Sequence, residues 1–516
     1  MSSTRPEQAD VRRYAERFGY GLSDDDVAEL LPLVAAGALA YDEVDDLYAE
    51  YVAVAPPERA VDFPAPEQNP LGAWYVKTHI PPRAHGPLDG RRVVIKDNIA
   101  VAGVPMSNGS RSLEGFVPSR DATVVERVLG AGGTVVGKAV CEDLCFSGSS
   151  FTSVSGPVLN PWDVSRTTGG SSSGNAALLA AGEVDLAIGG DQGGSVRIPA
   201  SFSGIVGHKP TFGLVPFTGA FPIERTIDHL GPMARTVRDA AVLLDVLAGP
   251  DGLDPRQTSE TIADVSATLD DGVAGLRIGI LQEGFGIDGL SDPDTDATVL
   301  AAAEALAGEG AEVVPISVPW HRTGAALWSV VATDGATYQM LNGNGYGLGV
   351  SGFYDPEQVA HFAEGKIAHA DDFSDTVKVT ALTGAWSLDA RGGASYAKAQ
   401  MLVPLLRAAY DAALGDVDVL VLPTTPYAAG KLLEPGDDRA AYLTKALAAI
   451  ANTAPTDLSG HPATSVPVGL VNGLPIGLMI VAPRFGDALG LRVAQAVERQ
   501  QGTLRAPVVA SAAAPR

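Results

Sequence analysis

The chain has 516 residues, of which 46% are hydrophobic and 19% are charged, and its formal net charge at pH 7 is −25. This composition is typical of a large globular protein with a sizeable core. The negative charge argues against nucleic acid and anionic membranes as partners, because both select basic surfaces. With no apolar segment in the first residues and no long apolar run elsewhere, we expect a cytoplasmic protein.

Residues 1–70 are predicted to form a separate helical segment. The run Ser-Asp-Asp-Asp at 23–26 resembles a capping box, and the apolar residues after it share one helical face. A second helix is expected over 42–54 and ends before a Pro-Pro pair. Because the segment carries no chemical motif, we favour a role in packing or subunit contact.

From residue 71 to residue 505 the pattern changes to strands that alternate with helices. The predicted strands span 92–96, 134–136, 184–188, 276–281, 312–316, 417–422 and 475–481. The predicted helices span 123–130, 173–181, 237–247, 296–307, 325–341, 396–414 and 440–452. Apolar strands between helices indicate an α/β fold with a mostly parallel sheet that is covered on both faces.

Three further stretches have weaker patterns. Residues 250–275 and 343–395 are richer in Gly, Asp and Ser, and we expect them to form insertions or a lobe beside the functional site. Residues 506–516 are predicted to be a flexible tail.

The chain has two cysteines, Cys141 and Cys145. Their spacing is too short for a useful crosslink and does not match the C-x-x-C pattern of zinc or redox sites. We expect both to be buried thiols in a reducing compartment. The histidines show no metal-binding motif such as H-E-x-x-H, and we expect neither a metal nor another cofactor.

A buried strand is predicted to end in the sequence Gly-Gly-Asp-Gln-Gly-Gly-Ser-Val-Arg at 189–197. Glycines allow the backbone to approach a ligand closely, so successive N–H groups can converge on a developing oxyanion. Ser195 at the end of this run is a candidate nucleophile. An N-capping turn would use the same residues, so this motif alone does not establish a catalytic serine.

A second cluster, Thr-Thr-Gly-Gly-Ser-Ser-Ser-Gly-Asn at 167–175, leads into a predicted helix. A helix that starts in this way can bind phosphate, so a phosphate cradle is one interpretation. The sequence at 132–138 also fits G-x-x-x-x-G-K. However, Ala139 stands where a Walker motif needs Ser or Thr, and this argues against nucleotide binding.

A third piece is Val-Val-Ile-Lys-Asp-Asn at 93–98, where Lys96 ends an apolar strand. A lysine at such a position is usually paired or reaches solvent. Desolvation favours the neutral amine, which can act as a base near pH 7.

Together these three segments resemble the amidase signature family of serine hydrolases. The similarity extends from about residue 74 to residue 482 and includes the stretches at 207–213, 418–424 and 460–467. The resemblance implies a large twisted mixed sheet wrapped in helices. It also implies a catalytic triad of Lys96, Ser171 and Ser195, in which Ser171 follows a cis peptide bond.

In this interpretation Lys96 takes the proton of Ser171 while Ser171 takes that of Ser195, and the relay reverses to protonate the leaving amine. The N–H groups of Gln192, Gly193 and Gly194, with that of Ser195, are expected to form the oxyanion hole. His208 and His229 lie near the signature, and we interpret both as structural because the lysine supplies the base.

The sequence is similar to that of bacterial broad-range amidases, which convert simple aliphatic and aromatic amides to acids and ammonia. The resemblance implies a homodimer to which the N-terminal segment contributes. Asp191 and Arg197 are expected to brace the nucleophile loop or to contact substrate. Candidate substrate-binding residues are Asp191, Phe146, Trp328 and Ile450.

Two alternatives stay open. A glutaminyl-tRNA amidotransferase-type subunit shares the signature and would need a partner and an ammonia channel. A non-catalytic protein whose glycine loops bind an anion is the alternative from a different class.

Overall fold

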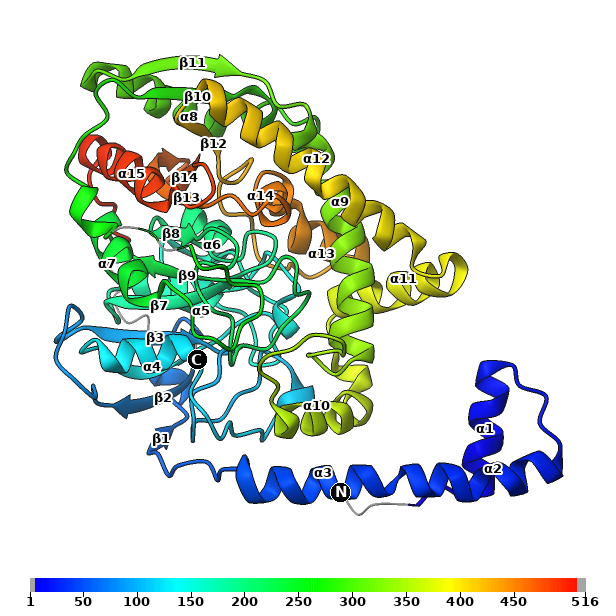
Figure 1. The fold of residues 1–516 in the computed structure, drawn as a ribbon. Helices are drawn as coiled ribbons and strands as arrows, with labels where there is room; N and C mark the ends of the chain where they lie inside the picture. Colours follow the sequence, from blue (N-terminus) through cyan, green and yellow to red (C-terminus); the bar gives the residue numbers. More distant parts are fainter. Residues whose placement is uncertain (1–4, 261, 263, 508–516) are drawn as a thin grey trace. The chain divides into compact units, whose positions relative to one another are not determined.

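The computed structural model describes residues 5–260, 262 and 264–507 (Figure 1). Contacts within the chain divide it into two units, one that ends at Pro56 and one that begins at Pro57. This division lies before residue 70, where the sequence suggested a boundary. The predicted tail at 506–516 lies outside the described residues from position 508 onward.

The first unit consists, within its described residues, of α1 (Gln8–Phe18), α2 (Asp24–Gly37) and α3 (Leu39–Tyr51). The capping box expected before α2 is present. Ser23 Oγ accepts a hydrogen bond of 3.2 Å from the Asp26 N–H, and the Asp26 carboxylate accepts one of 2.8 Å from the Ser23 N–H. These bonds satisfy two of the N–H groups that a helix start leaves without partners.

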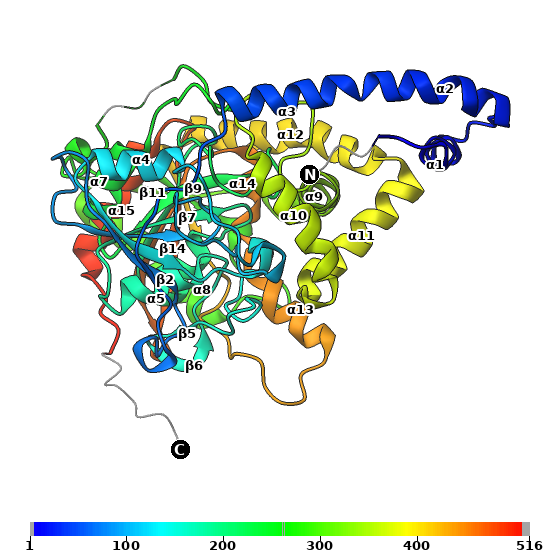
Figure 2. The ribbon, with the colours of Figure 1, turned by 90° about the horizontal axis from the view of Figure 1, so that it is seen from below.

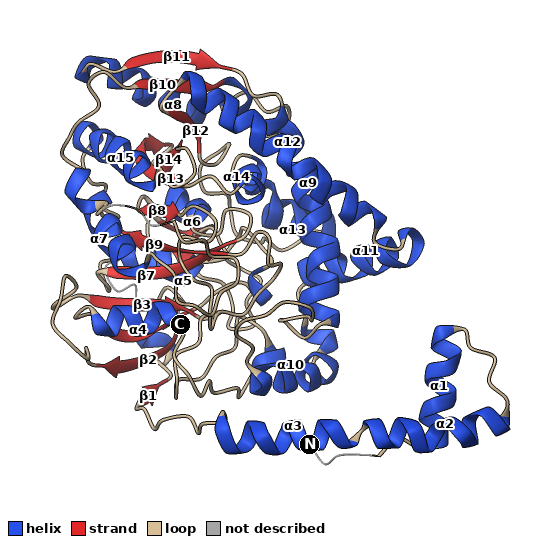
Figure 3. Cartoon of the chain, viewed as in Figure 1, coloured by secondary structure: helices blue, strands red, loops and turns tan. Residues whose placement is uncertain are grey.

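The second unit is built on a mixed β-sheet, drawn in red in Figure 3 with helices on both of its faces. Within the described residues twelve strands form this sheet, in the order β1-β2-β4-β3-β7-β9-β8-β13-β14-β12-β10-β11. The strands of this sheet and of a separate β5–β6 hairpin are β1 (Val61–Asp62), β2 (Trp74–Ile80), β3 (Arg92–Lys96), β4 (Thr134–Ala139), β5 (Leu159–Asn160), β6 (Asp163–Thr167), β7 (Leu186–Asp191), β8 (Val206–Lys209), β9 (His229–Ala234), β10 (Arg277–Leu281), β11 (Glu312–Ile316), β12 (Val419–Pro423), β13 (Ala463–Val471) and β14 (Leu474–Val481).

Helices cover both faces of the sheet, and Figure 2 shows α10, α11 and α13 gathered beside α9. Their bounds are α4 (Thr123–Gly130), α5 (Ser173–Ala180), α6 (Arg197–Ser203), α7 (Val237–Leu247), α8 (Pro293–Ala305), α9 (Trp320–Gly335), α10 (Pro356–Ala368), α11 (Asp375–Arg391), α12 (Ala394–Asp416), α13 (Arg439–Leu447), α14 (Ala454–Ser459) and α15 (Asp487–Gln501). The stretch 343–395, expected as an insertion or lobe, contains α10 and α11. None of the helices in the described residues has both the length and the apolar character needed to cross a bilayer.

The mixed sheet confirms the fold implied by the resemblance and corrects the mostly parallel sheet inferred from the pattern alone. Strand β3 is parallel to β4 and β7, and β10 is parallel to β11 and β12. The remaining pairings in the sheet are antiparallel. The pattern missed β9 and β13 because their Gly and Pro residues interrupt the apolar runs.

Alternation along the strands separates two hydrophobic cores. Val93 and Ile95 of β3 belong to a core shared with α4, α7, α8 and α15. Val94 points to the opposite face and packs with residues of α5. Because side chains alternate along a strand, Lys96 at the end of β3 shares the face of Val94. The fold therefore directs this amine toward the start of α5.

Candidate active site

Lys96 is completely buried at the end of β3 and contacts Ser171, which lies two residues before α5. Its Nζ donates a hydrogen bond of 2.8 Å to Ser171 Oγ and one of 3.2 Å to the carbonyl oxygen of Gly190. Both acceptors are uncharged. The amine is thus held at hydrogen-bond distance from a hydroxyl group with which it can exchange a proton.

The backbone at Ser171 is fixed by the segment that follows β4. The peptide bond between Gly170 and Ser171 is cis. A Cβ on Gly170 would lie 1.9 Å from the carbonyl oxygen of Ser149, so only glycine fits here. The Gly170 N–H donates to the Gly148 carbonyl at 2.9 Å, and the Glu142 N–H donates to the Ser171 carbonyl at 3.3 Å. Ser171 consequently has a defined position relative to Lys96.

Ser195 lies between β7 and α6, and its backbone contacts the residue that follows Ser171. The N–H of Ser172 donates a hydrogen bond of 3.2 Å to the carbonyl oxygen of Ser195. Ser195 is 7% exposed and lines a hollow in the protein. The structure therefore places Lys96 in contact with Ser171 and joins the residue after Ser171 to the backbone of Ser195, which lines the hollow.

A buried ion pair holds the loop around Ser195. Arg197 and Asp191 are both completely buried, and Arg197 Nη2 lies 2.9 Å from Asp191 Oδ1. The same carboxylate accepts hydrogen bonds from the N–H groups of Gly194 at 2.7 Å and Val196 at 3.0 Å. Although burial alone would raise the pKa of Asp191, the charge of Arg197 holds that pKa far below its usual value. Neither Asp191 nor Arg197 is among the residues that line the hollow.

Two side chains from distant parts of the sequence orient the glycine turn. Trp328 Nε1 donates a hydrogen bond of 2.6 Å to the carbonyl oxygen of Gln192, and Thr453 Oγ1 donates one of 2.6 Å to that of Gly193. In a planar trans peptide the N–H points away from the carbonyl oxygen, so the Gly193 N–H points away from Trp328. The N–H of Gly194, expected in the oxyanion hole, is engaged by Asp191.

The hollow beside Ser195 has mainly apolar walls. The expected wall residues Phe146, Trp328 and Ile450 all line it, as do Gln192 and Gly193. The sequence interpretation did not identify the other lining residues, which are Cys145, Ser147, Gly148, Ile223, Ile227, Ala332 and Leu447. Most of them lie on irregular segments or at helix ends, where periodicity gives no signal, whereas Ala332 lies on α9 one turn after Trp328.

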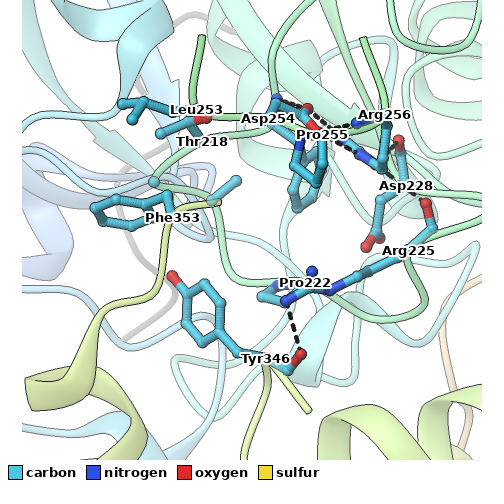
Figure 4. A pocket seen from close by; sticks show the side chains of 13 residues that line it. Thr218, Pro222, Arg225, Asp228, Leu253, Asp254, Pro255, Arg256, Tyr346 and Phe353 are labelled. Atoms are coloured by element: carbon cyan, nitrogen blue, oxygen red, sulfur yellow. Dashed lines mark hydrogen bonds and ion pairs between the residues drawn. The ribbon is translucent and has the colours of Figure 1, made fainter. Parts of the chain in front are cut away.

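The wall residues Ile223 and Ile227 belong to a loop that also contains Arg225 and Asp228, which Figure 4 shows beside Arg256. Arg256 donates hydrogen bonds to the carbonyl oxygens of Asp228 at 2.8 Å and Arg225 at 3.2 Å. The Ile223 N–H donates to Asp228 Oδ1 at 3.2 Å. Burial raises the pKa of Asp228 to about 8. These contacts hold the loop that brings the two isoleucines to the Ser195 hollow without a regular element.

A second buried lysine lies one strand away from Lys96. Lys138 on β4 forms an ion pair of 2.9 Å with Asp97 Oδ1. The other carboxylate oxygen of Asp97 accepts from the N–H groups of Ser107 at 2.9 Å and Asn108 at 2.8 Å. Lys138 is therefore neutralised by a carboxylate, whereas Lys96 donates hydrogen bonds to a hydroxyl and a carbonyl and lies beside the thiol of Cys145.

The two histidines near the signature do not line the hollow. His208 is buried between Thr464 at 2.8 Å and Asp487 at 3.1 Å. His229 contacts the carbonyl oxygen of Ile227 at 2.8 Å, and burial lowers its pKa well below the usual value. These contacts agree with the structural role expected for both.

The fold, the glycine turn and the buried lysine together define a hydrolase of the amidase type. A family model described as Amidase matches residues 55–491, and the chain belongs to this family. It is 50% identical over 513 residues to an enantioselective amidase from Rhodococcus rhodochrous, covering 98% of each chain.

The chain is also similar to an amidotransferase subunit and to a peptide amidase. One component of a glutamyl-tRNA(Gln) amidotransferase from Synechococcus is 41% identical over 435 residues, which is 82% of this chain and 87% of the relative. The crystal structure of native peptide amidase from Stenotrophomonas maltophilia matches with a TM-score of 0.67 and 31% identity, over 82% of this chain and 85% of that chain. The chain is thus similar both to proteins named as amidases and to a subunit of an amidotransferase.

Proposed function

We propose that this protein hydrolyses small aliphatic or aromatic carboxylic amides to the acid and ammonia through an acyl-enzyme on Ser195. The observation that carries the proposal is the buried hydrogen bond of 2.8 Å from Lys96 to Ser171, next to the Ser195 hollow. The extended similarity to an enantioselective amidase supports the same class of reaction.

In the first step Ser195 Oγ attacks the amide carbon, and its proton passes to Ser171 Oγ as the Ser171 proton passes to Lys96 Nζ. The C–N bond then breaks, and the relay returns a proton to the nitrogen, which leaves as ammonia. Water attacks the acyl-enzyme by the same route and regenerates Ser195. This sequence requires Lys96 to enter the cycle as an uncharged amine.

The tetrahedral intermediate carries a negative oxygen that needs hydrogen-bond donors. Because Asp191 engages the N–H of Gly194, we assign the oxyanion hole to the N–H groups of Gln192, Gly193 and Ser195. Removal of one such donor typically costs about 2.7–4 kcal/mol of transition-state stabilisation.

The walls indicate which acyl groups the hollow accepts. Phe146, Trp328 and Ile450 provide aromatic and branched apolar surface, and Ile223 and Ile227 add to it. Such surface stabilises an alkyl or aryl group mainly by removing it from water. No cofactor is needed for the proposed relay.

We also propose a homodimer to which the N-terminal unit contributes. This unit exposes large apolar side chains, with Leu33 68%, Tyr41 75% and Tyr51 73% exposed. Exposed apolar surface of this kind is typical of subunit contacts. The free, buried state of Cys141 and Cys145 is compatible with the cytoplasmic location that we predict from the sequence.

The test is a panel of amides, including acetamide, benzamide and phenylacetamide, incubated with the purified chain while ammonia is measured. Ser195→Ala should abolish turnover and retain the circular dichroism spectrum of the wild type. Hydroxylamine should divert part of the product to a hydroxamic acid, since both nucleophiles compete for the acyl-enzyme. Appreciable turnover by Ser195→Ala would refute the assignment.

The similarity to amidotransferase components supports a second candidate, a protein that passes ammonia to a partner enzyme. This role requires a partner chain, whereas an independent amidase does not. Turnover of simple amides by the purified chain alone would favour the amidase. Activity restricted to glutamine in the presence of a partner would favour the alternative.

A further inference from the structure

One polar side chain in the apolar hollow has no partner. Gln192 is 3% exposed and lines the hollow beside Ser195. Its Nε2 and Oε1 atoms are both buried and form no hydrogen bond with any described residue. Buried polar groups in folded proteins nearly always have a partner, so this amide is suited to a ligand that both donates and accepts a hydrogen bond.

The backbone on either side fixes where this side chain points. The carboxylate of Asp191 is turned into the protein toward Arg197. The carbonyl oxygen of Gln192 is held by Trp328 Nε1 at 2.6 Å. Gln192 lines the hollow, whereas neither Asp191 nor Arg197 does, so we take the Gln192 side chain to face the hollow. Its amide is therefore presented to whatever occupies the space next to Ser195.

The position of Gln192 limits which part of a substrate it reaches. Our proposed function places the Gln192 N–H at the substrate carbonyl oxygen, and this inference rests on that function. A side chain on the same residue then lies near the carbon next to the scissile carbonyl. Among simple substituents on that carbon, a hydroxyl group donates one hydrogen bond and accepts another, as Oε1 and Nε2 of Gln192 require.

We propose that Gln192 is a specificity-determining residue that recognises a hydroxyl group on the carbon next to the scissile carbonyl, and so selects one enantiomer of aromatic 2-hydroxy amides. Three contacts then distinguish the two enantiomers at this carbon. The carbonyl is held at Ser195, the aromatic ring lies against Phe146, Trp328 and Ile450, and the hydroxyl group bonds Gln192. The other enantiomer cannot place its ring and its hydroxyl group in these positions at once.

The test uses both enantiomers of mandelamide and of 2-phenylpropionamide, in which a methyl group replaces the hydroxyl, with phenylacetamide as the unsubstituted reference. Gln192→Met keeps the length of the side chain and the backbone N–H but removes both hydrogen-bonding groups. We expect it to lower kcat/KM for the preferred mandelamide enantiomer about tenfold more than for phenylacetamide. The enantiomeric ratio for mandelamide should fall with it, while that for 2-phenylpropionamide should not.

Ile450→Val is the matched control, because it changes the same hollow without changing a polar group. It should alter kcat/KM for mandelamide and 2-phenylpropionamide in parallel. Parallel losses in Gln192→Met, or an unchanged ratio for mandelamide, would overturn the inference while wild-type turnover of phenylacetamide upholds the proposed function. If the wild type hydrolyses none of these amides, the proposed function fails and the inference fails with it.

Discussion

Lys96 donates a hydrogen bond of 2.8 Å to Ser171, and both side chains are completely buried. The contact joins the end of a strand to the start of a helix that lie far apart in the sequence. It exists because alternation along β3 turns Lys96 to the face on which α5 packs. The proposed chemistry depends on this contact more than on any other.

Lys96→Met should lower kcat/KM for benzamide by about 10²–10⁴-fold, because it removes the only group in the relay that can store a proton. The substitution keeps an apolar side chain of similar length, so the fold should persist. Steady-state kinetics measure the loss of activity, and thermal unfolding checks that the fold persists. A variant that keeps more than about a tenth of wild-type activity would exclude Lys96 as the general base.

Lys138→Met should instead act on stability. It leaves the carboxylate of Asp97 buried without its cation, which typically costs about 3–5 kcal/mol. Urea unfolding should therefore show a much larger loss of unfolding free energy for Lys138→Met than for Lys96→Met. Asp97→Asn added to Lys138→Met should recover part of the loss, and no recovery would mean that the ion pair is not the cause.

The sequence predicted the parts of this site that lie at the ends of regular elements. Lys96 ends an apolar strand, Ser195 follows a buried strand and a glycine turn, and Ser171 precedes a helix of small residues. Each of these has a local signal that does not depend on distant packing. Their catalytic roles came from the family resemblance and stay predictions.

The wall of the hollow could not be predicted in the same way. Ile223 and Ile227 lie on a loop whose carbonyl oxygens are held by Arg256, and no local pattern encodes that long-range contact. The strand order could not be inferred either, since antiparallel β9 contains Gly and Pro and has no apolar alternation. Long-range hydrogen bonds and close packing decide both features.

Gly193→Ala should impair catalysis through a steric clash rather than through a change in backbone conformation. A Cβ at this position would lie 2.6 Å from Trp328 Cζ2 and 2.9 Å from Trp328 Cε2. The indole must shift, and its hydrogen bond to the Gln192 carbonyl is disturbed. We expect kcat/KM to fall about 10–100-fold, because catalysis tolerates little displacement of the oxyanion hole.

Trp328→Phe provides the partner for a double-mutant cycle. It removes the ring atoms that the new methyl group would meet. The loss in the double variant should be smaller than the sum of the two single losses, expressed as free energies. Strict additivity would show that Gly193 and Trp328 do not interact in this way.

Asp228 and Asp254 lie on either side of Arg256 and should respond to pH in opposite directions. Burial raises the pKa of Asp228 to about 8, whereas hydrogen bonds from Arg256 outweigh burial and lower the pKa of Asp254. Between pH 4 and pH 8 the unfolded Asp228 carboxyl is ionised while the folded one keeps its proton. The folded state thus binds more protons, and this group makes stability decrease as the pH rises.

Asp228→Asn mimics the protonated form and removes this pH dependence. Its free energy of unfolding relative to the wild type should therefore increase from pH 5 to pH 8, by up to about 1.4 kcal/mol per pH unit. Asp254→Asn is the matched control. It loses a carboxylate that stabilises the fold above its unfolded pKa, so it should be less stable than the wild type over the same range. Urea unfolding at several pH values distinguishes the two, and a constant difference between Asp228→Asn and the wild type would show that Asp228 is ionised in the folded protein.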